Sequence, residues 1–253
     1  MTSVSIGKKA FTNFLDSFGK GLEDIALHVD DDIMSASVGA MTHYIKRTLP
    51  VESEERGDLH ISDLQKLRTF LKTNRDEDLT LEQSTTTGML TVTSGNARLL
   101  IQGTAYIKSQ KETILIESLI VKSEQNGWTK WVDEKLSCSA TVSTKELEPV
   151  TNMAKVVGDK MTCKMRFDAQ DGEVVFNAGK AASGTMFVRV ALVDAQGPNG
   201  GVESTFAHWL PDLLDSVPNG HCLMHTGPDT ILVVRQEETG YLLLVMDQQF
   251  EED

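Results

Sequence analysis

The spacing of apolar and polar positions predicts short amphipathic helices, and the clearest lies at residues 62–75. One apolar stripe recurs there at helical spacing and consists of Leu64, Leu67, Phe70 and Leu71. The basic residues that fall outside this stripe are Lys66, Arg68, Lys72 and Arg75. Ser62 is a suitable N-cap. The sequence therefore predicts a helix that buries one side and presents positive charge on the other.

The same unit, one strand followed by a helix and three strands, is predicted four times along the chain. The other apolar helical stripes lie at 8–22, 147–157 and 206–214. Strands are predicted at 2–7, 25–29, 33–38, 42–49, 59–61, 79–83, 89–93, 97–102, 161–167, 173–177, 185–192, 221–225, 230–236 and 241–246, with the first strands of the last two units beginning at 137 and 202. Pro149 and Pro211 lie several residues past the expected caps, so these two helices should be short or kinked.

Residues 104–135 do not follow this order. The stretch 114–121 is apolar enough for a strand, but its polar flanks place it on no regular element, and it is interpreted as part of a connector. The predicted fold class is α+β, with an N-terminal domain at 1–103, a connector at 104–135 and a C-terminal domain at 136–253.

Composition is that of a soluble globular protein, with 40% apolar and 24% charged residues among 253. No run reaches the roughly 18 apolar residues of a membrane span, and the N-terminus has no apolar signal core. An intracellular location is expected, in the host cytoplasm for a viral protein or in the nucleus for a eukaryotic one. Cys138, Cys163 and Cys222 form no CxxC pair, which favours buried reduced thiols.

The formal net charge of −13 would repel nucleic acid if it were spread evenly. A surface that faces DNA must therefore be a segregated basic one.

Motifs for catalysis or metal binding are weak. His221 and His225 would share one face of a strand while Cys222 points away, so no metal site is predicted. Asp30, Asp31 and Asp32 are typical of a solvated turn. The chain has no GxSxG elbow, and the glycine-rich loop at 197–201 lacks the lysine of a phosphate loop. The sequence predicts neither an enzyme nor a cofactor.

Two stretches resemble segments of a known family. The first is GAMTHYIKRTL at 39–49, which resembles the segment of that family with a methionine and a histidine at a pocket for partner proteins. The second is YLLLVMDQQFEED at 241–253, which resembles the family's last strand and acidic tail. With the fourfold order of elements, the chain resembles the sliding DNA clamps: proliferating cell nuclear antigen, its archaeal relatives and the bacteriophage clamps. The connector is longer than usual, carries Trp128 and Trp131, and suggests a divergent, viral clamp.

The resemblance implies a homotrimeric ring with helices lining the hole and sheets outside. Such a ring encloses double-stranded DNA without sequence specificity, is placed there by a clamp loader, and tethers a DNA polymerase and other replication proteins as a processivity factor. It requires no cofactor, metal or membrane.

The resemblance also implies three sets of site residues. The basic residues expected to face DNA are Lys8, Lys9, Lys20, Lys66, Arg68, Lys72, Arg75, Lys145, Lys155 and Lys160. The pocket for a partner peptide is expected to be lined by Met41, His43, Tyr44, Ile45, Ile114, Ile116, Leu119, Leu244, Val245 and Met246. The subunit interface is expected to pair Ala97, Leu99 and Ile101 with Thr185, Phe187 and Arg189.

Two other classes of function stay open from the sequence. One is an enzyme on a duplicated α+β scaffold with an active site between its halves, which predicts clustered titratable groups with shifted pKa values. The other is a viral structural or assembly protein, which predicts neither such a cluster nor a basic inner face.

Overall fold

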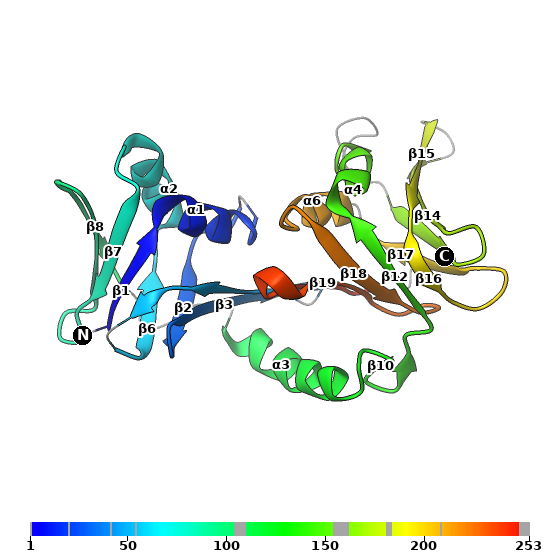
Figure 1. Cartoon of the computed structure of the whole chain (residues 1–253), viewed down its shortest axis with the longest axis horizontal. Helices are drawn as coiled ribbons and strands as arrows, with labels where there is room; N and C mark the ends of the chain where they lie inside the picture. Colours follow the sequence, from blue (N-terminus) through cyan, green and yellow to red (C-terminus); the bar gives the residue numbers. More distant parts are fainter. Residues whose placement is uncertain are drawn as a thin grey trace. The chain divides into compact units, whose positions relative to one another are not determined.

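The computed structural model describes residues 2–19, 21–40, 42–53, 55–103, 110–153, 162–180, 184–207 and 209–247, without the side chains of 110–115, 180 and 184. The chain divides into two compact units (Figure 1): unit 1 holds residues 1–38 and 45–111, and unit 2 holds residues 39–44 and 112–253. None of the helices described is long and apolar enough to cross a membrane.

Both units contain two repeats of the predicted order. The first repeat consists of β1 (Thr2–Gly7), α1 (Lys8–Asp16), β2 (Ile25–Asp30), β3 (Ile33–Ala40) and β4 (His43–Pro50). The second consists of β6 (Gly57–Ile61), α2 (Leu64–Thr73), β7 (Asp78–Gln83), β8 (Met89–Ser94) and β9 (Ala97–Gln102). The third consists of β12 (Cys138–Ser143), α4 (Thr144–Thr151), β13 (Cys163–Asp168), β14 (Glu173–Lys180) and β15 (Gly184–Ala191). The fourth consists of β17 (Val202–Phe206), α6 (Leu210–Asp215), β18 (His221–Thr226), β19 (Leu232–Gln236) and β20 (Tyr241–Val245).

The two repeats of a unit exchange their first strands. In unit 1, β1 pairs with β7 of the second repeat and β6 pairs with β2 of the first. In unit 2, β12 pairs with β18 and β17 pairs with β13 in the same way. Short strands extend the sheets beside β1 and β12, namely β5 (Glu52–Ser53) and β16 (Val193–Gln196). Neither repeat of a unit can therefore complete its sheets without the other.

The helices of each unit lie side by side (Figure 1) and bury their apolar stripes against the sheets. In unit 1 the buried helical residues include Phe11, Phe14, Leu67 and Leu71. The strands alternate buried positions with half-buried or exposed ones, as in β1 and β12. The predicted repeat and the α+β class are confirmed, and all three cysteines are free and buried as expected.

Several predicted boundaries were wrong. Helix α1 ends at Asp16 instead of residue 22, where Ser17 Oγ donates to Phe14 O and Gly19 adopts a positive φ. The N-cap of α2 is Asp63, whose carboxylate accepts from Lys66 N at 2.8 Å, while Ser62 Oγ donates to Gln102 O. The stretch between the strands predicted at 42–49 and 59–61 contains β5 and the start of β6.

The last helix and the connector also differ from what the sequence predicts. The stripe at 206–214 combines the end of β17 with the six-residue α6, so Pro211 lies in the first turn and interrupts no helical hydrogen bond. Pro149 does lie inside α4. The connector stretch 114–121 is helical: it belongs to α3 (Gln110–Gln125), which is followed by a hairpin of β10 (Lys130–Trp131) and β11 (Glu134–Lys135).

Candidate nucleic-acid and partner surfaces

The exposed side of the helix pair in unit 1 is basic. Lys9 on α1 and Lys66, Lys72 and Arg75 on or just after α2 are exposed. The acidic residues beside them are Asp16 at the end of α1, Asp63 at the start of α2, whose carboxylate lies 3.8 Å from Lys66 Nζ, and the exposed Asp76, Glu77 and Asp78 after α2. Lys8 is half-buried, and its Nζ donates to Asn74 O at 2.8 Å, which ties the start of α1 to the end of α2. Cations on an exposed helix face suit non-specific attraction to phosphates. Lys20 lies outside the described residues.

Arg68 differs from the other predicted DNA contacts because only 9% of it is exposed. Its Nη2 donates to Leu15 O at 3.2 Å and to Gly19 O at 2.7 Å, so it satisfies carbonyls at and beyond the end of α1. This correction assigns Arg68 to the packing of α2 on α1 instead of to the basic surface. Arg47 also contacts α1, since its Nη1 donates to Asn13 O and its guanidinium lies 5.9 Å from the ring centroid of Phe14.

The exposed side of the helix pair in unit 2 is acidic over the part that the structure describes. Lys145 is exposed on α4, as predicted for a DNA contact, but Glu146 and Glu148 are exposed on the same helix and Asp212 and Asp215 on α6. Lys155 and Lys160 lie outside the described residues. Over the described residues, the helices of the two units thus carry opposite charge on the same fold.

In unit 2, helix α3 and the β10–β11 hairpin pack on one face of β19 and β20. Their apolar cluster is formed by Tyr44, Ile120, Trp128, Trp131, Leu136, Ile231, Val233, Leu242 and Leu244, with Ile116, Leu119 and Met246 partly buried around it. We call it the connector cluster. The two indole rings stack 6.4 Å apart at an interplanar angle of 3°, and Arg235 lies 6.0 Å from the Trp128 ring.

The connector cluster contains only some of the residues predicted for a partner pocket. Tyr44 and Leu244 are fully buried in it, and Ile116, Leu119 and Met246 form its partly exposed rim. Ile45 and Val245 are buried neighbours of Tyr44 and Leu244, so strand alternation turns them to the opposite face, and their inclusion in one pocket is corrected. His43 is half-buried and burial lowers its pKa. Met41 and the side chain of Ile114 lie outside the described part.

The two strands predicted to join subunits, β9 and β15, are the outer strands of their sheets. The residues predicted on β9, Ala97, Leu99 and Ile101, share its more buried face, whereas Arg98, Leu100 and Gln102 on the other face are exposed. On β15, Thr185, Phe187 and Arg189 share the exposed face. Leu100 and Phe187 are 53% and 64% exposed, which is high for large apolar side chains. Leu100 was missed because alternation shows only which face is buried, not which strand is outermost.

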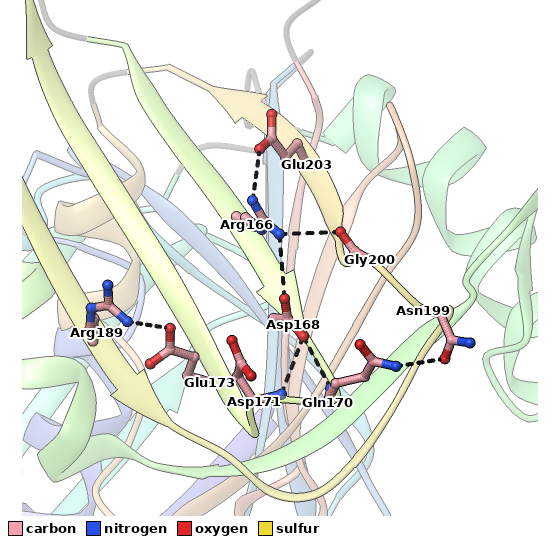
Figure 2. A network of polar contacts seen from close by, with 9 residues as sticks. All are labelled: Arg166, Asp168, Gln170, Asp171, Glu173, Arg189, Asn199, Gly200 and Glu203. Atoms are coloured by element: carbon pink, nitrogen blue, oxygen red, sulfur yellow. Dashed lines mark hydrogen bonds and ion pairs between the residues drawn. The ribbon is translucent and has the colours of Figure 1, made fainter.

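A polar hollow of about 660 Å³ lies on the outer face of the β15–β14–β13–β17 sheet. Figure 2 shows the polar network along it: Arg189 Nη1 donates to Glu173 Oε1 at 2.7 Å, and Arg166 Nη2 donates to Gly200 O at 3.3 Å. Asp168 Oδ1 accepts from the backbone N–H groups of Gln170 and Asp171, at 3.1 and 3.2 Å. This carboxylate fixes the turn after β13, and Phe187 and Lys164 lie at the other end of the same strands.

Of the titratable groups with shifted pKa values, Cys222 and His225 lie on opposite faces of β18, and Cys163 lies on β13. Burial, with the nearby Arg235 as a second cause, lowers the pKa of His225 to about 4, and burial raises the pKa values of Cys163 and Cys222 to about 12. His221 is exposed while Cys222 is buried, in agreement with the alternation expected of β18. The described part of the chain holds no cluster of three residues suited to a metal ion.

Comparison of sequences with protein-family models and with curated proteins finds no match. Solved structures do match. PCNA of A. fulgidus, in a structure with the C-terminal region of FEN-1, has a TM-score of 0.72 and 12% identity over 100% of both chains. PCNA of Thermococcus kodakaraensis has a TM-score of 0.67 and 14% identity over 98% of this chain and 100% of its own.

The DNA polymerase III beta subunit of Thermotoga maritima is also similar, with a TM-score of 0.70 and 11% identity. The match covers 99% of this chain but 66% of that protein, so this chain spans somewhat less than two thirds of the bacterial subunit. At these identities the likeness concerns the fold alone. The chain has the fold of the sliding DNA clamps.

Proposed function

We propose that this protein is a sliding clamp, a homotrimeric ring that encloses duplex DNA and acts as a processivity factor. The observation that carries the proposal is the basic exposed face of the α1–α2 pair on a clamp fold of an otherwise acidic chain of net charge −13. Attraction between these cations and phosphates is independent of base sequence, so a ring held on DNA by topology stays free to slide.

Ring closure is proposed at β9 and β15. An outer strand presents unpaired N–H and C=O groups, and pairing with a strand of another copy satisfies them. Leu100 on β9 and Phe187 on β15 would meet on the outer face of the joined sheet. A DNA polymerase and a clamp loader are the partners expected of such a ring.

The test is the solution mass by light scattering, followed by retention on DNA. Three chains of 27.8 kDa each are expected at micromolar concentration. The protein should stay on closed circular DNA after loading and leave linear DNA of the same sequence through its ends. Equal retention on both forms would contradict an enclosing ring, even if the protein were a trimer.

A further inference from the structure

The end of β20 lies beside the start of β4 within unit 2, and this contact can be compared with a pairing of the outer strands β9 and β15. Met246 N, just after β20, donates to Thr42 O at 2.9 Å, just before β4. Strands β20 and β4 are the last strands of the fourth and first repeats. Strands β9 and β15 are the last strands of the second and third repeats. If β9 of one copy pairs with β15 of another, the order of repeats makes that pairing equivalent to the pairing of β20 with β4 inside the chain.

The ladders fix which residues correspond. In unit 1 the cross-strand partners run Val4, Leu81, Val92 and Leu99. In unit 2 they run Ala140, Met224, Val234 and Leu243. Val4 and Ala140 each stand four residues before the first residue of a helix, α1 or α4. Leu99 thus corresponds to Leu243, and its neighbour Leu100 to Leu244.

On the other strand, Phe187 resembles Tyr44 in residue type and in the face of the strand on which it lies. Each is an aromatic residue directly before a buried aliphatic residue, Val188 or Ile45, and so turns to the opposite face of its sheet. The pair Leu100 and Phe187 at the joint between copies therefore takes the place that Leu244 and Tyr44 take inside the chain.

The two places differ in what covers them. Tyr44 and Leu244 are fully buried because Ile120, Trp128 and Trp131 of the connector pack on them. The Tyr44 hydroxyl also donates to Glu117 Oε1 of α3 at 3.3 Å. Leu100 and Phe187 instead remain 53% and 64% exposed. Pairing of backbone edges alone would leave both on the outer surface.

Phe187 lines a hollow whose charged residues are of both signs: Lys164, Arg166 and Arg189, and Asp168, Asp171, Glu173, Glu203 and Asp229. The cross-strand rows nearest Phe187 hold Lys164 and Arg189, whereas Asp168 and Glu173 pair at the far end of β13 and β14. Phe187, Asn177 and Lys164 are successive cross-strand partners on one face and line the polar hollow. Arg189 is next on the same face, held by Glu173 but still 73% exposed (Figure 2). Arg98 is exposed two residues from Leu100 on β9. Guanidinium and ammonium groups around an apolar centre suit carboxylates beside an apolar anchor.

We propose that this surface, Leu100 of one copy with Phe187, Lys164 and Arg189 of the next, is a docking site for a segment of a partner protein. The segment carries aromatic or aliphatic anchors next to carboxylates, as the chain's own connector does where Ile120 and Glu117 meet Tyr44. The site rests on the ring proposed above, because only a joint between copies brings Leu100 to Phe187.

The probe is a fluorescently labelled peptide with the sequence of residues 110–135, added to the full-length protein and followed by anisotropy. Saturable binding is expected, weakened about tenfold by Phe187→Ala and about fivefold by Lys164→Glu. Val193→Ala is the matched control, since Val193 is a 58% exposed apolar residue on β16 and should leave binding unchanged. The site would be overturned if no saturable binding were seen, or if Phe187→Ala bound the peptide as tightly as the unchanged protein. Equally tight binding is also the result expected if the peptide only took the place of the chain's own connector.

Light scattering on the same samples separates this inference from the ring. Lys164 lies on β13, two strands in from the outer strand β15, so Lys164→Glu should bind the peptide about fivefold more weakly and keep the mass of the unchanged protein. A trimer that binds no peptide overturns the docking site and leaves the clamp intact. A monomer overturns the ring, and with it the joint. A trimer in which Leu100→Ala binds the peptide as well as the unchanged protein also overturns the joint as the site.

Discussion

The helix pairs of the two units share one fold and carry opposite surface charge. In unit 1 the exposed side of α1 and α2 bears Lys9, Lys66, Lys72 and Arg75. In unit 2 the described exposed side of α4 and α6 bears Lys145 against Glu146, Glu148, Asp212 and Asp215. Both pairs keep their apolar stripes buried. The fold therefore constrains only the buried stripe, and the outer face is free to carry the charge that function requires.

The largest effect should come from what the two pairs have in common. Leu67 in α2 and Leu147 in α4 are both essentially unexposed. Replacing either by alanine should lower the free energy of unfolding by about 2–5 kcal/mol, because it removes apolar contacts and leaves a cavity. Urea unfolding followed by circular dichroism measures this loss. Gln65→Ala, at an exposed position of α2, is the control and should shift stability by less than about 0.5 kcal/mol. A negligible cost for Leu147→Ala would show that the two pairs do not depend equally on packing.

The next contrast separates the buried Arg68 from the exposed lysines of the helix pairs. Arg68→Met removes the donors to Leu15 O and Gly19 O and should cost about 1–3 kcal/mol of stability, since these carbonyls lose a buried partner. The dependence of DNA binding on salt should not change. Lys145→Met, at an exposed position, should leave stability unaltered. If Arg68→Met kept full stability and reduced the salt dependence, Arg68 would be a phosphate contact after all.

The burial of Arg68 shows a limit of prediction from the sequence. The stripe of Leu64, Leu67 and Leu71 predicted α2 and its buried side correctly. Whether a basic residue at the border of the stripe reaches solvent depends on where α1 ends, and the sequence placed that end six residues too late. The N-cap was assigned to Ser62 because the local sequence does not show which distant groups a hydroxyl can reach. Its hydroxyl bonds to Gln102, a partner 40 residues away.

The connector shows a second kind of limit. The segment ILIESLIV at 114–121 is dense in aliphatic residues and fits a strand as well as a helix. Ile116, Ile120 and Ser123 do recur at helical spacing, and the structure buries Ile120 and Ser123. The helix is decided by its contacts with β19 and β20, which no local pattern reveals. The outer position of β9 and β15 is likewise a property of the whole sheet.

The charge contrast itself can be broken by reversing charge on each pair in turn. Lys66→Glu with Lys72→Glu should weaken binding to a short duplex about tenfold and reduce the slope of log affinity against log salt by about two, one for each lost phosphate contact. Glu148→Lys with Asp212→Lys should strengthen binding and steepen the slope. Titrations at a series of salt concentrations give both values. Equal weakening from reversing Lys145 alone would show that unit 2 contacts DNA as strongly as unit 1.

The smallest difference lies at the helix starts. Asp63 caps α2 through a bond of 2.8 Å to Lys66 N, whereas Ser143 caps α4 through a longer bond of 3.4 Å to Lys145 N. Asp63→Ala should therefore cost about 1 kcal/mol of stability, and Ser143→Ala less, because a longer bond satisfies its helical donor less well. Thermal and urea unfolding measure both. Ser62→Ala tests the residue that the sequence suggested as the cap. It should leave α2 capped by Asp63 and cost less stability than Asp63→Ala. An equal loss of stability would show that the bond from Ser62 to Gln102 matters as much to the start of this helix as the cap does.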